Sequence, residues 1–354
     1  MTSQPGTPDE KIRVKVLSPI PARYFLHQLP EERSEWGNCR FTFDPEAREY
    51  DWLVVYEDLR TANKDGKRGL QETLACPSRQ TMLVTTEPSS IKHYGNAYTR
   101  QFGCVLTSQE EWALPHRDRI FSQAGLIWIY GVGTGYELSF DHMVTQPPSN
   151  KTRDISMVFS PKRMRHTLHH RRFDFMQQLM QILPEMDVYG RGAKPLDDKA
   201  EALDAYRYHV AIENHISPHH WTEKLSDAFL GLTLPFYAGC PNAADYFPPE
   251  SFIPIDMKDP AGAAAMIRQA IADKEYEKRL PAIIEARRRV LFEHNLFAVI
   301  AREIGKRHSQ NLPAETKGAV LYSRHALRSK HPLGGLQDLY GKLRARAMHL
   351  LKRD

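Results

Sequence analysis

Apolar residues in the first half of the chain gather in short runs that alternate with polar or amphipathic segments. The runs are rich in β-branched and aromatic residues and are bounded by turn formers, which is typical of buried strands. They cover residues 11–18, 51–58, 81–90, 102–110 and 125–133. Because polar or helical connections separate them, the pattern predicts an α/β unit with a largely parallel sheet.

A second unit with the same alternation follows residues 145–154 (TQPPSNKTRD), whose proline, serine, asparagine and charged residues are typical of a linker. Four further runs predict strands, at residues 154–160, 186–190, 208–214 and 233–239. Helical patterns cover residues 171–183, 195–206, 222–232, 259–273 and 276–305. The helix over 171–183 has an apolar stripe formed by Phe173, Met176, Leu179, Met180 and Leu183.

These patterns predict an N-terminal domain over 1–148, a C-terminal domain over 149–310 and a basic helical tail over 311–354. Two α/β units joined by a linker favour a ligand cleft where the carboxyl ends of their strands face each other.

The end of the chain has leucines at helical spacing on one side and lysines or arginines on the other. The leucines are Leu336, Leu339, Leu343, Leu350 and Leu351, and the basic residues are Lys342, Arg344, Arg346, Lys352 and Arg353. This pattern predicts a basic amphipathic helix. It leaves two placements open, because such a helix lies either on an anionic membrane surface or against its own protein.

Composition narrows the class of protein. With 354 residues, 41% of them hydrophobic, and a net charge of +5, the chain suits a globular protein with two cores and a mild preference for anionic partners. The four cysteines lack regular spacing and predict free thiols. The polar N-terminus lacks the apolar region of a secretory signal, so we expect a cytoplasmic protein, peripheral at the inner face of the membrane if its tail binds there. A nucleic-acid-binding protein is disfavoured, because the sequence lacks a basic stripe interleaved with aromatic residues.

Residues 211–241 concentrate the polar chemistry of the chain. Glu213 and Asn214 end a predicted strand, and Thr222 is a suitable N-cap for the helix that follows. Glu223 and Lys224 then lie in the first helical turn, where free amides and a lysine favour a diphosphate and a carboxylate suits ribose hydroxyls. Spacing alone leaves a second interpretation open, namely an exposed helix start stabilised by its dipole.

The order of motifs in this region resembles glycosyltransferase family 10, the α-1,3/1,4-fucosyltransferases, in its bacterial form. The matching motifs are Glu213–Asn214, the TEK triplet 222–224, Gly239-x-Pro241 and the segment FPPESFI over 247–253. Residues 154–192 are similar to the first strand, loop and helix of the family's nucleotide domain. The resemblance covers roughly residues 80 to 300.

The resemblance implies an α/β protein of the GT-B type, in which two Rossmann-like domains face a central cleft, here followed by the C-terminal basic amphipathic helix. It implies an inverting glycosyltransferase that moves fucose from GDP-fucose to a hydroxyl of a glycan acceptor, such as a surface polysaccharide or lipopolysaccharide. Two alternatives stay open: another nucleotide-sugar donor on the same fold, and a catalytically silent module that binds a sugar nucleotide or a glycan.

The resemblance also implies roles for individual residues. The donor site includes Arg172, with Arg165 and Arg171 as neighbours that could replace it, and residues of the 211–241 region: Glu213, Asn214, His220, Glu223 and Lys224. His220 stands where the family often has an aromatic residue against the nucleotide, which leaves the identity of the base open. Glu87 is the predicted catalytic base, and Glu57 and Asp58 are the competing carboxylates.

We expect no metal site and no required cofactor, with a divalent cation at most stimulatory. The chain contains no DxD triplet, which disfavours a metal-dependent fold of the GT-A type. The pair His166 and His170 has helical i, i+4 spacing, but arginines surround it and no nearby acid completes a ligand set. His215 and His219 flank a proline loop, where contacts to a phosphate or an acceptor fit better than a metal.

Overall fold

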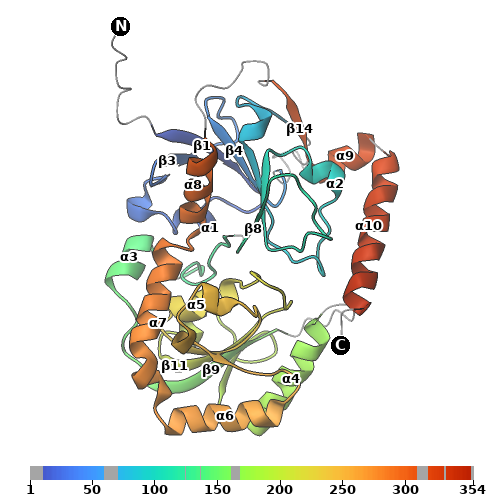
Figure 1. Ribbon diagram of the computed structural model, residues 1–354. Coiled ribbons are helices and arrows are strands. Elements are labelled where there is room, and N and C mark those ends of the chain that lie inside the picture. The colour runs from blue at the N-terminus through green and yellow to red at the C-terminus, as the bar shows by residue number, and fades with distance from the viewer. Residues whose placement is uncertain are drawn as a thin grey trace.

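The structure is a computed structural model that describes residues 11–59, 71–123, 125–135, 137–160, 168–308, 318–330 and 332–351. Two separate parallel sheets dominate it, one from each half of the chain (Figure 1). Helices cover both sheets, and the C-terminal helix runs along one side of the molecule (Figure 1). The predicted fold class, an α/β protein with two Rossmann-like domains, is confirmed.

The first sheet has the strand order β2-β3-β1-β4-β6-β7-β8 in the described residues. Its strands pair in parallel except for β2, which lies antiparallel at the edge. The strands are β1 (Ile12–Leu17), β2 (Glu35–Trp36), β3 (Cys39–Thr42), β4 (Trp52–Tyr56), β6 (Thr81–Val84), β7 (Cys104–Thr107) and β8 (Arg119–Phe121). Short helices connect them: α1 (Arg23–Leu26), η1 (Pro30–Glu32), η2 (Ser78–Gln80) and α2 (Asn96–Thr99).

The second sheet has the order β10-β9-β11-β12-β13 and is parallel in each described pairing. Its strands are β9 (Arg153–Phe159), β10 (Asp187–Gly190), β11 (Tyr206–Ile212), β12 (Leu234–Ala238) and β13 (Ile253–Pro254). The helices of this half are α3 (Phe140–Thr145), α4 (His169–Ile182), η3 (Lys199–Ala202), α5 (Glu223–Leu230), η4 (Ala243–Asp245), η5 (Pro249–Ser251), α6 (Pro260–Ala272) and α7 (Glu275–Phe292). The four strands and most helices predicted for this half are confirmed, and residues 195–206 form only the short η3.

Helix α4 shows why the sequence pattern was informative. Four members of its predicted stripe are buried against the second sheet, and Met180 packs beside them. The buried members are Phe173, Met176, Leu179 and Leu183. Because this apolar face is fixed on the sheet, the first turn of α4 is held at the end of the molecule toward which β9 runs.

The predicted strand over residues 125–133 is wrong. In the described part of this segment, backbone amides donate to aspartate side chains instead of a neighbouring strand. Ile129 donates to Asp227 at 3.3 Å, and Gly131 donates to Asp198 at 2.9 Å. The apolar side chains of the segment are buried nevertheless, because Trp128 packs with α5 and α7 in the core of the second half. The segment is therefore an extended crossing between the two halves.

The long helix predicted over residues 276–305 is divided. Its first part, α7, packs in the second half, whereas α8 (Leu296–Arg307) packs in the core of the first sheet. Asn295 is the N-cap at which α8 begins, and its side-chain amide also donates to the Gln28 carbonyl at 2.8 Å. Residues 128–143 pack in the core of the second half, although the predicted ranges assigned them to the N-terminal domain. Helix α8 packs in the core of the first half, although the predicted ranges assigned it to the C-terminal domain. The other domain limits stay predictions.

The tail returns to the first domain. Strand β14 (Val320–Tyr322) pairs antiparallel with β5 (Gln71–Thr73), and α9 (Arg324–Lys330) leads into α10 (Pro332–Leu351). The predicted C-terminal helix is therefore confirmed. None of the helices in the described ranges combines the length and apolarity that a membrane span requires.

Candidate active site

A cavity of about 340 Å³ lies between the two domains. The first domain contributes Glu87 and Ile91, which follow β6. The second domain contributes the larger part, from the ends of β9 and β11 and from α4, η3 and α5. Five of the seven predicted site residues line it: Glu87, Arg172, Asn214, Glu223 and Lys224. The cavity therefore lies at the carboxyl ends of parallel strands, where α/β folds bind ligands.

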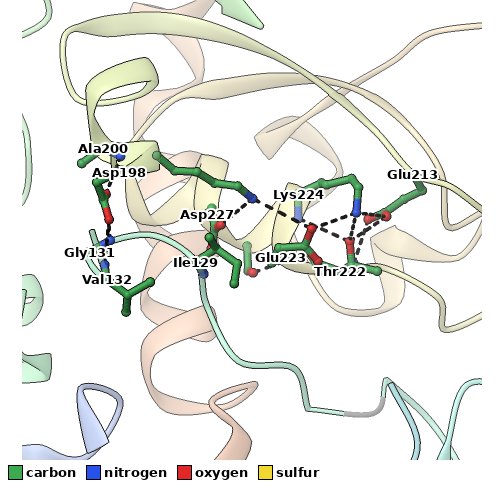
Figure 2. Close-up of polar contacts among 12 residues, drawn as sticks. Ile129, Gly131, Val132, Asp198, Ala200, Glu213, Thr222, Glu223, Lys224 and Asp227 are labelled. Atoms are coloured by element: carbon green, nitrogen blue, oxygen red, sulfur yellow. Dashed lines mark hydrogen bonds and ion pairs between the residues drawn. The ribbon is translucent and has the colours of Figure 1, made fainter. Parts of the chain in front are cut away.

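The start of helix α5 forms one wall of the cavity. Thr222 caps the helix as predicted, because its hydroxyl accepts the Lys224 amide at 3.4 Å. Glu213 lies beneath the cap and is fully buried. Its carboxylate accepts the Thr222 amide and the Thr222 hydroxyl, both at 2.7 Å (Figure 2). Glu213 is absent from the cavity lining, so the structure shows it supporting the helix start.

Glu223 and Lys224 form a coupled pair in the first turn. Lys224 Nζ lies 2.9 Å from Glu223 Oε1 and 3.6 Å from Glu213 Oε2. Burial opposes ionisation of both groups, but their mutual attraction outweighs it. The attraction between the two charges raises the pKa of Lys224. Together with the charge of Lys199, it holds the pKa of Glu223 well below its ordinary value. Both residues are therefore charged at neutral pH, and the cavity wall carries an ammonium beside a carboxylate.

Arg172 is a buried cation in the first turn of α4. Its side chain donates to the Asn214 carbonyl oxygen, and the residue is 6% exposed. Among the described residues, no carboxylate forms an ion pair with the guanidinium, and burial lowers its pKa by more than Glu213 and Glu223 raise it. A buried charge that lacks an ionic partner is costly unless a ligand supplies the counter-charge. Arg172 therefore indicates an anion site.

The neighbouring arginines differ from Arg172. Arg171 lines a separate cavity of about 680 Å³ on the other side of α4, bounded by the turn Gly239–Pro241. Arg165 and His166 lie outside the described residues. Register along α4 thus decides which arginine reaches Lys224 and Glu223.

Glu87 is the carboxylate that the first domain presents to the cavity. Its backbone carbonyl accepts the Gln109 side-chain amide at 2.7 Å, and the same amide donates to the Lys92 carbonyl at 2.9 Å. Gln109 is 1% exposed, so it fixes the loop that bears Glu87 from below. The side chain of Glu87 is exposed at the cavity wall, where an acceptor hydroxyl could reach it.

The competing carboxylates are bound within the first domain. Glu57 accepts the Tyr94 hydroxyl at 2.7 Å and also contacts the Thr86 hydroxyl and the Lys92 ammonium. Asp58 accepts the Leu59 amide at 2.9 Å, and burial raises its pKa. Neither residue lines the cavity. Of these three carboxylates, Glu87 is therefore the one that lines the cavity.

His220 does not line the cavity. It is 3% exposed, and its Nδ1 lies 3.1 Å from the Ser108 hydroxyl of the first domain. Burial lowers its pKa to about 3, so the ring is neutral. Nδ1 of the neighbouring His215 likewise lies 3.0 Å from the hydroxyl of Ser90, another residue of the first domain. The structure thus places His220 in the contact between the domains, and its predicted position against the nucleotide lacks support in this arrangement.

Sequence reasoning did not identify three further ionisable residues of the cavity: Lys199, His209 and Asp227. Lys199 Nζ lies 2.7 Å from Asp227 and 4.0 Å from Glu223. Asp227 also accepts the Ile129 amide, and burial raises its pKa to about 6. Asp227 could have been predicted, because it follows Glu223 by one helical turn and so lies on the same face of α5. Lys199 and His209 belong to other elements, and their spacing in the sequence does not indicate that they join the cavity.

Over the described ranges, no three His, Cys, Asp or Glu side chains converge in a way that could hold a metal ion. His215 Nε2 lies 3.5 Å from Glu110, and His219 Nδ1 contacts the Tyr246 hydroxyl at 2.5 Å. The absence of a metal requirement stays a prediction.

Comparison with known proteins gives a match over the second domain. The family model described as "Glycosyltransferase family 10 (fucosyltransferase) C-term" matches residues 148–278. A 4-galactosyl-N-acetylglucosaminide 3-alpha-L-fucosyltransferase of Homo sapiens is 33% identical over 110 residues, which are 29% of this chain and 30% of the relative. A 3-galactosyl-N-acetylglucosaminide 4-alpha-L-fucosyltransferase of Homo sapiens has the same identity and coverage. The match thus spans less than a third of these relatives.

Among solved structures, an alpha1,3-fucosyltransferase with GDP-fucose is similar at 16% identity and a TM-score of 0.43, covering 79% of this chain and 84% of that one. A GtfA/B complex has 9% identity and a TM-score of 0.39, with 72% and 56% covered. The family match includes Arg172, Glu213, Asn214, Glu223 and Lys224. Over residues 148–278, this chain is therefore similar to the C-terminal domain of glycosyltransferase family 10, the fucosyltransferase family.

Proposed function

We propose that this protein is an inverting fucosyltransferase that moves fucose from GDP-fucose to a hydroxyl of a glycan acceptor. The observation that carries the proposal is the convergence of Glu87 with Arg172 and Lys224 on one cavity. The first is a carboxylate of one domain, and the other two are cations of the opposite domain. A transferase needs these two kinds of group on opposite sides of the bond that breaks.

The chemistry follows from the positions of these charges. Glu87 would accept the proton of the acceptor hydroxyl as its oxygen attacks the anomeric carbon. The bond from that carbon to the diphosphate breaks, and negative charge develops on the departing oxygen. Arg172, Lys224 and the positive end of the α5 dipole would stabilise that charge without help from a metal ion. Attack from the side opposite the leaving group inverts the anomeric configuration.

Fucose as the transferred sugar is supported by the family match and by the names of the relatives, which are fucosyltransferases. A different donor on the same fold is the first alternative, and the position of His220 outside the cavity leaves it open. A silent binding module is the second alternative. It is disfavoured because Glu87 lines the same cavity as the anion site.

A nucleotide survey tests the donor site. We expect GDP to raise the melting temperature of the protein more than UDP, ADP or dTDP. A ligand at about 100 times its Kd adds about 2.7 kcal/mol to the free energy of unfolding. Differential scanning fluorimetry with each nucleoside diphosphate measures the shift, and GDP release with each nucleotide sugar measures turnover. Failure of all four nucleotides to shift the melt would reject the donor site.

We further propose that α10 contacts an anionic membrane at its cytoplasmic face. The helix packs on the first domain through buried Ala345 and through His349, whose Nε2 lies 2.9 Å from the Ser89 hydroxyl. Leu339 and Leu343 are 53% and 55% exposed, beside exposed basic residues. The side chains of Leu336, Leu350 and Leu351 are outside the described set. The helix thus packs on its domain with one face and leaves apolar and basic groups outward.

Vesicle binding tests this placement. We expect the protein to cosediment with phosphatidylglycerol vesicles, less with neutral vesicles and less at high salt. Replacing Leu339 and Leu343 by glutamine should weaken binding at least about tenfold, because each buried leucine contributes about 1.5–3 kcal/mol. Met266 and Ile284, exposed on the second domain, provide a matched double glutamine control. Equal binding of both double variants would contradict the proposal.

A further inference from the structure

His209 is a buried histidine of the cavity for which the proposed reaction has no use. It lies in β11, is 6% exposed and lines the cavity. Within the described residues, Ser156 is its hydrogen-bond partner, through Nδ1 at 2.9 Å. Its Nε2 is not among the fully buried polar atoms that lack a partner. Because Nδ1 is taken by Ser156 and the residue lines the cavity, Nε2 is the ring nitrogen left for a ligand there.

The hydrogen bonds of Ser156 fix the tautomer of His209. The Ser156 hydroxyl donates its single proton to the Ala202 carbonyl. It can then only accept from His209, so Nδ1 carries the ring proton and Nε2 is a bare acceptor. Burial and the nearby Lys199 lower the pKa of His209 to about 3, which keeps the ring neutral. The cavity wall thus offers a fixed acceptor that requires an N–H or O–H donor.

The position of His209 along the cavity indicates which part of a ligand it meets. Figure 2 shows Glu223 between Asp227 on one side and Lys224 with Glu213 on the other. The Lys199 ammonium lies near both carboxylates, 2.7 Å from Asp227 and 4.0 Å from Glu223, and its charge acts on His209, which lines the same cavity. A diphosphate at Arg172 and Lys224, with its sugar toward Glu87, places the ribose at Glu223. The base then lies at Lys199 and His209.

We propose that His209 is a specificity-determining residue that recognises the nucleobase of the donor, accepting the N1–H of guanine at Nε2. This inference rests on the proposed function and adds the group that selects the base. Lys199 has three N–H donors, of which Asp227 and Glu223 take at most two, so it can donate to the O6 of the same base. Adenine presents the reverse pattern, an acceptor at N1 and an amine at C6, and would leave both side chains unsatisfied.

Nucleotide binding to a His209→Phe variant tests the inference. Calorimetry on the full chain measures Kd for GDP, IDP, ADP and inorganic pyrophosphate. We expect the variant to bind GDP about tenfold more weakly, to lose the preference for GDP over ADP, and to bind pyrophosphate as the wild type does. IDP keeps N1–H and O6 and should follow GDP. KM for the nucleotide sugar should rise while kcat changes little.

Two further variants separate recognition from folding. His209→Gln retains a side-chain acceptor and should restore part of the preference for GDP. His27→Phe replaces another buried neutral histidine, outside the cavity, and should leave all four Kd values unchanged. A His209→Phe variant that binds GDP like the wild type would overturn the inference, and so would one that loses pyrophosphate as well. If the wild type binds none of the nucleotides, the proposed function itself fails.

Discussion

Replacing Glu87 by glutamine is expected to slow sugar transfer at least about 10²-fold while GDP binds as before. Glutamine keeps the size and polarity of the side chain but cannot accept the proton of the acceptor hydroxyl. Glu87 lies on the first domain, whereas Arg172 and Lys224 lie on the second, so its loss should lower kcat without raising the Kd of GDP. Steady-state transfer kinetics and calorimetry on the same variant measure both quantities.

A matched control uses Glu111, an exposed carboxylate of the first domain that does not line this cavity. Glu111→Gln should transfer sugar at the wild-type rate. A near-normal rate for Glu87→Gln would remove its role as base and return attention to Glu57. That residue would first have to leave its hydrogen bond with the Tyr94 hydroxyl.

Replacing Arg172 by alanine is expected to lower kcat/KM for the nucleotide sugar by about 10²- to 10³-fold. The guanidinium is buried and lacks an ionic partner among the described residues, so a bound diphosphate would supply its counter-charge. Unlike Glu87→Gln, this variant should also bind GDP more weakly, because the interaction exists before the bond breaks and strengthens as it does. Calorimetry and transfer kinetics separate the two contributions.

The adjacent Arg171 provides the control, because it has the same chemistry but lines the cavity on the other side of α4. Arg171→Ala should retain GDP affinity and kcat/KM within about twofold. If Arg171→Ala is the impaired variant and Arg172→Ala is not, the register of α4 in the donor site is wrong. Thermal melts of both variants exclude a loss of folding as the cause.

The start of α5 could be predicted from sequence because it depends on neighbours in the chain. Thr222 caps the helix by accepting an amide two residues later, and Leu225 and Phe229 are buried on one face, as their spacing indicated. Strand positions in the second domain follow from the same kind of local pattern. The resemblance then pointed to Arg172, Glu223 and Lys224, and the structure brings them to one cavity.

The segment 125–133 shows where local pattern fails. Its apolar residues are buried, as a strand's would be, but its amides donate to Asp198 and Asp227, which lie far along the chain. An apolar run specifies burial and leaves open which groups satisfy its backbone. The same limit applies to helix 276–305, whose periodicity was correct but whose two parts pack on different domains.

The sequence by itself determined the class of fold, the cap and charges of α5, and the set of carboxylates and arginines from which the site is drawn. Only the tertiary structure decided that Glu87 faces the cavity while Glu57 is bound by its own domain, and that His220 lies between domains while His209 faces the ligand space. The reason is physical. Helix caps and apolar stripes are set within a few residues, whereas the partners of a buried polar group are set by which distant strands and helices pack around it.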